Sequence, residues 1–156
     1  MVHLVYCDNT GKKGDRVLDK IQSGKKTMII RSAAGRKIPY GRVFRGETLY
    51  FMEKGTAEVT LRATVVSVQN YVKLTDDEID NVFTENDAKL SLTEKQKERW
   101  RKKCICLVEF DKVETLNPPL HFERQNNMDD WLILEKIEDV LTGTSIPYTY
   151  EQSKLR

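Results

Sequence analysis

The residues best suited to bind a ligand gather in the first third of the chain. Between Gly11 and Arg45 there are eleven Lys or Arg residues and only two acidic ones, a local balance of +9 in a chain of net charge +2. Residues 75–88 reverse this balance, with six acidic residues and no basic one. The asymmetry favours a polyanion or a phosphate group on the basic side. The alternative is a solvated surface on which the two segments pair.

The most distinctive run, Ile21–Arg31, joins the expected end of a helix at Gly24 to an apolar strand. Within it, Lys26 and Arg31 are five positions apart. An odd separation puts two strand residues on opposite faces, but Lys26 falls at the turn and need not follow that alternation. If the two converge, Lys26 is a point charge for phosphate, and Arg31 is a bidentate donor to phosphate or a base edge. The alternative is that both pair with carboxylates such as Glu47 or Asp87.

A basic loop with one aromatic residue, SAAGRKIPYGR, follows the strand. Its cations could extend a contact along a nucleic-acid backbone, and a base could stack on its aromatic ring, a contact worth about 1–3 kcal/mol. Such a loop suits unpaired RNA better than a duplex. The alternative is that the cations are solvated and the ring covers the core. The candidate binding residues of the loop are Arg36, Lys37, Tyr40 and Arg42.

Familiar catalytic motifs are missing from the chain. The chain has two histidines, at 3 and 121, so there are few candidate residues for a histidine-based catalytic triad. Its three cysteines, at 7, 104 and 106, indicate buried thiols and not a disulfide framework or a metal site, so we expect neither metal nor cofactor. A catalytic Lys26 would need a pKa lowered by several units through burial or through cations such as Lys25, Arg31 and Arg36.

The elements that position these residues form one predicted domain over residues 1–141, followed by a tail or irregular arm at 142–156. Helical spacing with capping signals predicts helices within 14–24, from 75 onward and over 92–100, and both tryptophans, Trp100 and Trp131, are expected in the core. Apolar and alternating runs predict strands at 3–7, 27–31, 47–53, 58–71, 104–110 and 131–137, with a loop at Asn117–Pro119. Strands in succession indicate an antiparallel sheet or barrel and not repeated βαβ units.

The bulk properties of the chain fit a cytoplasmic domain. Its 156 residues suit one domain, with 39% hydrophobic and 32% charged residues. No apolar run approaches the roughly 20 residues that span a membrane. The first residues lack the basic-then-apolar order of a secretory signal. We therefore expect a cytoplasmic protein.

Three landmarks resemble the ASCH branch of the PUA-like superfamily. ASCH domains typically carry Gly-x-Lys-x-x-x-x-Arg between their first long helix and a barrel strand, which Gly24, Lys26 and Arg31 match. Gly46-Glu47 is similar to the family's Gly-Asp turn, and the CICLVEF run resembles its apolar strand ending in Glu-Phe. The likeness covers roughly residues 14–113. It implies an α+β, PUA-like, mostly antiparallel β-barrel with two or three flanking helices, and a ligand cleft in the barrel wall.

The chain departs from this pattern at position 29. In a subgroup that resembles acetylated-cytidine amidohydrolases, the third position after the Lys is Thr, which works with the Lys and a downstream Glu. Here that position is Ile29, which argues against the amidohydrolase chemistry.

Three functions remain as hypotheses. The first is a binding module for single-stranded RNA or a modified nucleotide, using Lys26, Arg31 and the loop at 35–42. The second is a small hydrolase acting on acylated nucleosides or RNA, with Lys26 central and Glu85 or Asp87 assisting. The third is a protein-interaction adaptor that uses the acidic helix at 75–88.

Overall fold

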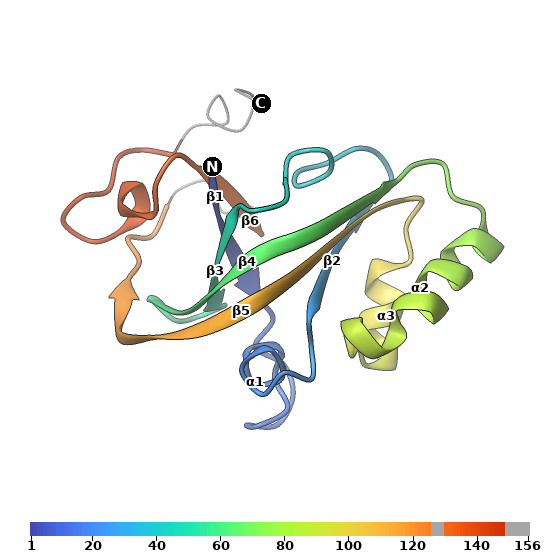
Figure 1. Ribbon diagram of the computed structural model, residues 1–156, viewed down its shortest axis with the longest axis horizontal. Coiled ribbons are helices and arrows are strands. Elements are labelled where there is room, and N and C mark those ends of the chain that lie inside the picture. Colours follow the sequence, from blue (N-terminus) through green and yellow to red (C-terminus); the bar gives the residue numbers. More distant parts are fainter. Residues whose placement is uncertain (126–129, 149–156) are drawn as a thin grey trace.

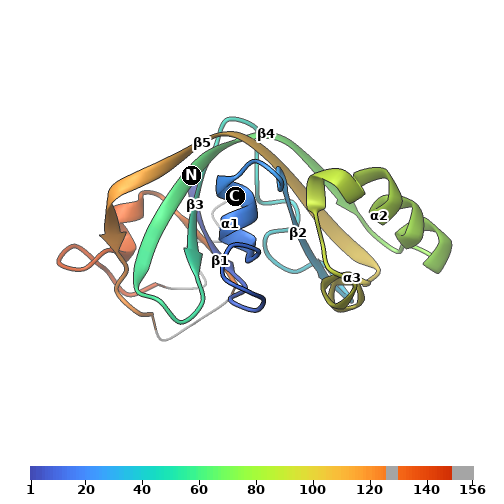
Figure 2. The ribbon, with the colours of Figure 1, turned by 90° about the horizontal axis from the view of Figure 1, so that it is seen from below.

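The computed structural model describes residues 1–125 and 130–148, in which six strands form one sheet. The order in the sheet is β2-β5-β4-β3-β1-β6; β1 and β3 are parallel and the other neighbours antiparallel. The sheet curls into a half-barrel, with α1 beneath the arch of β4 and β5 (Figures 1 and 2). The strands are β1 (Val2–Cys7), β2 (Met28–Ala33), β3 (Thr48–Glu53), β4 (Glu58–Tyr71), β5 (Cys104–His121) and β6 (Trp131–Leu134).

The core under the arch follows from alternation along the strands. Leu61, Ala63 and Val65 of β4 are buried in this core, because every second side chain of a strand points to the same face. α1 (Val17–Gln22) adds Ile21 to this core. The three cysteines are buried and free, as predicted.

Two helices lie together at one end of the sheet, beside β2 (Figure 1). They are α2 (Asp76–Leu90) and α3 (Glu94–Trp100), and each begins with a capping box, of which the one at Thr75 was predicted. Thr75 Oγ1 accepts a 3.2 Å hydrogen bond from the Glu78 amide, and Thr93 Oγ1 accepts one of 3.2 Å from the Gln96 amide. α2 buries an apolar stripe against β2 and β5, so the helical pair is fixed to the edge of the sheet.

β5 is longer than the sequence suggests, because it continues through the predicted loop at Asn117–Pro119 to His121. Its pairing with β4 passes from Leu61–Thr115 to Val59–Leu120, so several residues of β5 bulge there. A proline has no amide hydrogen for a ladder, but a bulge requires none. The prediction of a loop was therefore wrong.

The fold class is as predicted: an α+β, mostly antiparallel curled sheet with three α-helices. A 3-10 turn, Ile137–Val140, replaces the end of the predicted last strand. Of the predicted tail, Tyr148 packs on the core of β1 and β6, whereas residues 149–156 lie outside the described residues. Among the described helices, none has both the length and the apolar character needed to cross a membrane.

Candidate functional site

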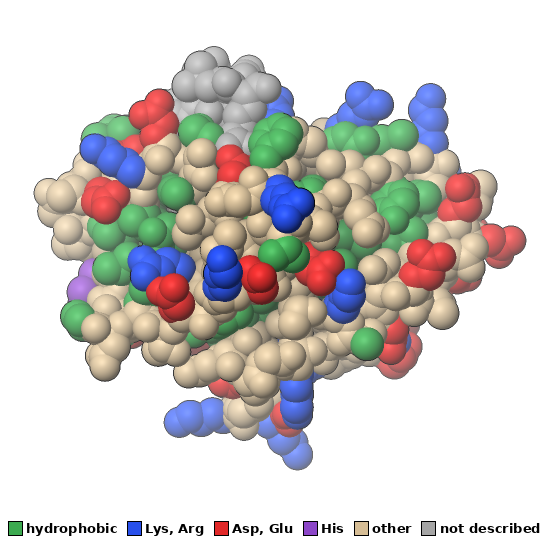
Figure 3. Space-filling model, viewed as in Figure 1, with side chains coloured by type: hydrophobic (Ala, Val, Ile, Leu, Met, Phe, Trp, Pro, Cys, Tyr) green, Lys and Arg blue, Asp and Glu red, His purple; other side chains and the backbone are tan. Residues whose placement is uncertain are grey.

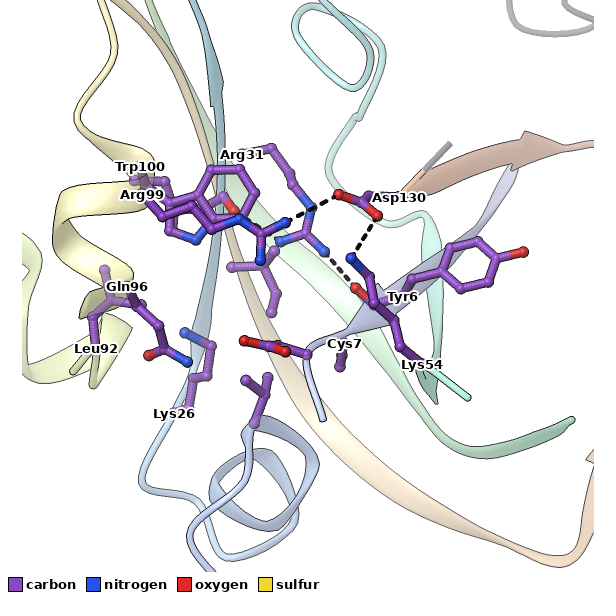
Figure 4. A pocket seen from close by; sticks show the side chains of 14 residues that line it. Tyr6, Cys7, Lys26, Arg31, Lys54, Leu92, Gln96, Arg99, Trp100 and Asp130 are labelled. Atoms are coloured by element: carbon purple, nitrogen blue, oxygen red, sulfur yellow. Dashed lines mark hydrogen bonds and ion pairs between the residues drawn. The ribbon is translucent and has the colours of Figure 1, made fainter. Parts of the chain in front are cut away.

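Lys26 and Arg31 of the motif line a cleft between the end of β1, the start of β2 and α3, called the main cleft below (Figure 4). The volume of the main cleft is about 460 Å³ when the part open to solvent is included. The centre of a water molecule can reach about 30 Å³ of this volume. The inner part is therefore narrow, with room for a small group and not for a whole nucleotide. The lining residues are Tyr6, Cys7, Asp8, Val17, Lys26, Ile29, Ile30, Arg31, Lys54, Leu92, Gln96, Arg99, Trp100 and Asp130.

Lys26 joins the motif to the C-terminus of α2. It is 4% exposed, and its Nζ donates a 2.5 Å hydrogen bond to the Leu90 carbonyl. Lys20 Nζ donates one of 2.8 Å to the next carbonyl, that of Ser91. Burial disfavours the charged amine and lowers the pKa of Lys26 to about 7, an effect to which the charges of Arg31 and Lys20 add. Near neutral pH much of Lys26 is therefore an uncharged amine.

Arg31 is held by aromatic rings and backbone carbonyls. Its guanidinium carbon lies 5.2 Å from the ring centroid of Trp100 and 5.7 Å from that of Trp131. Nη1 donates to the Ile30 carbonyl at 2.9 Å and Nη2 to the Tyr6 carbonyl at 2.8 Å. Nε is buried and makes no hydrogen bond with the described residues. Burial lowers the pKa of Arg31 below its ordinary value. The guanidinium is thus fixed in place with donor capacity to spare.

Within residues 1–125 and 130–148, two carboxylates line the main cleft, and their surroundings differ. Asp130 pairs with Lys54 Nζ at 2.9 Å and Arg99 Nη2 at 3.5 Å (Figure 4). Burial alone would raise the pKa of Asp130, but the hydrogen bond with Lys54 and the nearby cations bring it below its ordinary value. The hydroxyl of Thr10 donates a 2.8 Å hydrogen bond to the carboxylate of Asp8. Burial would likewise raise the pKa of Asp8, and the hydrogen bonds with Thr10 lower it.

Two further hollows continue from the main cleft to the basic loop. The first, called the bridging hollow, shares Arg31 and Trp100 with the main cleft and reaches Lys37. The second, called the loop hollow, shares Lys37 with the bridging hollow and is lined only by residues of the basic loop. In it, the guanidinium carbon of Arg36 lies 5.6 Å from the ring centroid of Tyr40. Each of the three spaces therefore shares lining residues with a neighbouring one.

The structure thus brings most of the predicted site residues to connected spaces. Lys26 and Arg31 share the main cleft, Lys37 lines the bridging hollow, and the loop hollow is lined by Arg36, Lys37, Tyr40 and Arg42.

The acidic partners considered from the sequence lie elsewhere. Glu85 is on the exposed face of α2 and does not line the main cleft. Asp87 forms an ion pair with Lys97 at 3.1 Å, and Glu47 Oε1 lies 3.0 Å from His3 Nε2. Among the described residues, the carboxylates that line the main cleft with Lys26 and Arg31 are those of Asp8 and Asp130.

Sequence reasoning missed Lys54, Arg99 and Asp130 as cleft residues. Each comes from a different element far along the chain, and no local pattern marks any of them. Trp100, expected in the core, is partly exposed and lines the main cleft, whereas Trp131 is buried as predicted.

Comparison with known proteins identifies the fold. No protein-family model matches the chain, and no curated protein matches its sequence. An ASCH protein from Zymomonas mobilis superposes with a TM-score of 0.52 at 13% identity, over 72% of this chain and 68% of that one. Two single-residue variants of that protein give TM-scores of 0.53 and 0.54 at 11% and 14% identity, over 76% of this chain and 72% and 74% of theirs.

The curled six-stranded sheet with its flanking helices defines the class of fold as a mostly antiparallel half-barrel. Within that class, the chain has an ASCH-like fold, in agreement with the resemblance of its motif. At 11–14% identity the likeness concerns the fold, so the function must be argued from the residues of the site.

Proposed function

We propose that the protein is an ASCH-like domain that binds single-stranded RNA or a modified nucleotide. The ligand lies along the main cleft, the bridging hollow and the loop hollow. The observation that carries the proposal is that each of these spaces shares lining residues with the next, which places Arg31, Lys37 and the other loop cations along neighbouring spaces.

Cationic and aromatic groups accompany each other along these spaces. In the main cleft, Arg31 and Arg99 both lie over the ring of Trp100, at 5.2 and 4.7 Å. In the loop hollow, Arg36 lies over Tyr40. Cations bind phosphates while a partly exposed ring offers a face to a base, and this combination supports binding of unpaired nucleic acid. The narrow main cleft disfavours a duplex.

The outer face of β4 and β5 offers no comparable surface. Figure 3 shows Lys and Arg interspersed there with Asp and Glu. Arg62, for example, pairs with Glu114 at 2.6 Å across the two strands. A face with both signs interspersed attracts a polyanion weakly, so we place the ligand on the path from the main cleft to the loop.

The proposal is tested by fluorescence anisotropy of a short unstructured RNA at about 50 and 200 mM salt. We expect saturable binding that weakens with salt, and weaker binding by Arg36→Gln/Lys37→Gln. The salt slope should fall by about 0.7 for each phosphate that the variant no longer neutralises. Lys112→Gln/Lys136→Gln is the matched control, because these lysines are exposed and line none of the three spaces. A wild type that fails to bind at either salt concentration contradicts the proposal.

A second candidate function, hydrolysis of an acylated nucleoside or of RNA, is favoured by one observation. Lys26 lines the main cleft with a pKa of about 7, so its neutral amine is available as a nucleophile or base. Ile29 is 2% exposed and brings no hydroxyl or acid to it, which weighs against the amidohydrolase chemistry. Release of acetate from an N-acetylated cytidine, or cleavage of labelled RNA, by the wild type and not by Lys26→Met would favour this candidate. Turnover that persists in Lys26→Met would exclude Lys26 as the catalytic group.

A further inference from the structure

The Asp130 carboxylate is surrounded by cations contributed by separate parts of the fold. Lys54, at the turn after β3, lies 2.9 Å from one oxygen, and Arg99 of α3 lies 3.5 Å from the other. Arg31 is close enough to act on Asp130 electrostatically. Figure 4 shows Asp130 between Lys54 and Arg99, with the Arg31 guanidinium beside them. One carboxylate thus faces three cations.

The three cations do not need Asp130 to be held in place. Arg31 is already bonded to two backbone carbonyls and stacked on Trp100, and Arg99 also lies over that ring. Lys54 and Arg99 are 36% and 45% exposed in their side chains, and ion pairs at such exposure contribute little to folding. The arrangement of donors around one anionic group is instead typical of a site for a phosphate.

We propose that Lys54, Arg99 and Arg31 form an anion subsite for a phosphate group of the ligand, and that Asp130 occupies it when no ligand is bound. The side chain of Asp130 is 39% exposed, so its carboxylate can turn towards solvent. A phosphate then takes its place and accepts from the same donors. The identity of this phosphate, as part of RNA or a nucleotide, rests on the proposed function.

The proposal differs from the sequence-based view of the motif. Lys26 was expected to hold the phosphate, but it is 4% exposed and bonded to Leu90. Lys54 and Arg99 are more exposed and flank the narrow inner space, which admits a group of about the size of a phosphate. The subsite accordingly places the strongest anion contact away from Lys26. It also makes Asp130 an internal competitor of the ligand.

The test compares Asp130→Asn with Asp8→Asn, using titration calorimetry with inorganic pyrophosphate and anisotropy with a short RNA. Both variants remove one negative charge from the main cleft, but only Asp130 pairs with Lys54 and Arg99. We expect Asp130→Asn to bind both probes about three- to thirtyfold more tightly than the wild type, because no exposed ion pairs have to be broken. Asp8→Asn should gain less than threefold. Arg99→Gln should abolish the gain in the Asp130→Asn background and weaken binding in the wild type.

The outcomes separate the subsite from the proposed function. Equal gains in the two Asn variants, or no gain in Asp130→Asn, overturn the subsite. RNA binding that is unaffected by Asp130→Asn and Arg99→Gln also overturns it but leaves the proposed function standing. Pyrophosphate binding that strengthens in Asp130→Asn without any RNA binding supports the subsite and removes RNA as the ligand. If Asp130→Asn does not fold, Arg99→Gln in the wild type decides, because unchanged pyrophosphate affinity there overturns the proposal.

RNA oligomers with and without a 5′-phosphate distinguish a terminal phosphate, which a nucleotide also carries, from a phosphodiester of the RNA backbone. A terminal phosphate in the subsite makes the gain in Asp130→Asn depend on the 5′-phosphate. A phosphodiester in the subsite gives the same gain with both oligomers. If the wild type binds both oligomers and Asp130→Asn binds neither of them more tightly, the assignment of the subsite to a phosphate of the ligand is overturned.

Discussion

The buried amine of Lys26 gives the wild type a pH dependence of stability that Lys26→Met should remove. In the folded protein the amine is 4% exposed and its pKa is about 7, against an ordinary value of 10.5, chiefly because burial disfavours its charge. Methionine fills a similar volume without a charge. The substitution therefore removes the titrating group and leaves most of the apolar packing.

The sign follows from the protons that each state binds. Below pH 7, Lys26 is protonated in both the folded and the unfolded chain. Between pH 7 and 10.5 the folded chain has released this proton while the unfolded chain still binds it, so the free energy of unfolding rises with pH. At about 1.36 kcal/mol per pKa unit, the wild type should gain roughly 2–3 kcal/mol relative to Lys26→Met between about pH 6 and 9.

The assay is urea unfolding followed by tryptophan fluorescence at several pH values in this range, on the wild type, Lys26→Met and Lys25→Met. Lys25 is the exposed neighbour in the same turn, so Lys25→Met removes the same formal charge without changing a buried group. Its curve should run parallel to that of the wild type. Parallel curves for the wild type and Lys26→Met would refute the reasoning, because a solvated Lys26 binds the same number of protons in both states.

Three further predictions concern stability and reactivity. Trp131→Ala, which empties a fully buried site, should destabilise the fold by about 3–5 kcal/mol in urea unfolding, and a loss below about 1 kcal/mol would contradict the burial. Thr75→Ala should lower the free energy of unfolding by about 1 kcal/mol through loss of the α2 cap, whereas Thr84→Ala on the exposed face should not lower it. Cys7 and Cys106, whose pKa values burial raises to about 12, should resist a thiol reagent at pH 8 until urea unfolds the chain; rapid labelling of the native protein would show that they are accessible.

Local signals in the sequence predicted the elements well. The capping boxes at Thr75 and Thr93 are hydrogen bonds between residues three apart, so nothing outside each helix is needed to form them. The strand predicted at 58–71 has the observed bounds, because its apolar alternation continues over four buried residues. The prolines after Asn117 were misread because the bulge that accommodates them depends on the pairing with β4. When the strand pairing is not known, an asparagine followed by two prolines indicates a loop.

The motif and the loop predicted part of the site, and tertiary packing supplied the rest. Arg99 and Trp100 enter the main cleft because α3 packs against β2, where Ser32 Oγ donates a 2.7 Å hydrogen bond to the Trp100 carbonyl. Asp130 enters because β6 pairs with β1. Neither event leaves a pattern of spacing in the sequence. Residues that only the packing of distant segments brings together therefore cannot be predicted from local sequence patterns, even when they complete a distinctive motif.

The spacing of the motif has a structural reason that connects these observations. Lys26, at the turn, bonds to the carbonyl that ends α2, and the next residue, Thr27, donates its amide to the Lys89 carbonyl at 3.0 Å. Lys26 is a cation or a hydrogen-bond donor at the negative end of that helix, so it fixes the helical pair to the start of β2 in either protonation state. Five residues later, Arg31 meets the ring of Trp100, which the same helical pair carries. The lysine of the motif thus positions the wall of the cleft against which the arginine stacks. Loss of Lys26 should therefore weaken ligand binding even if Lys26 never touches the ligand.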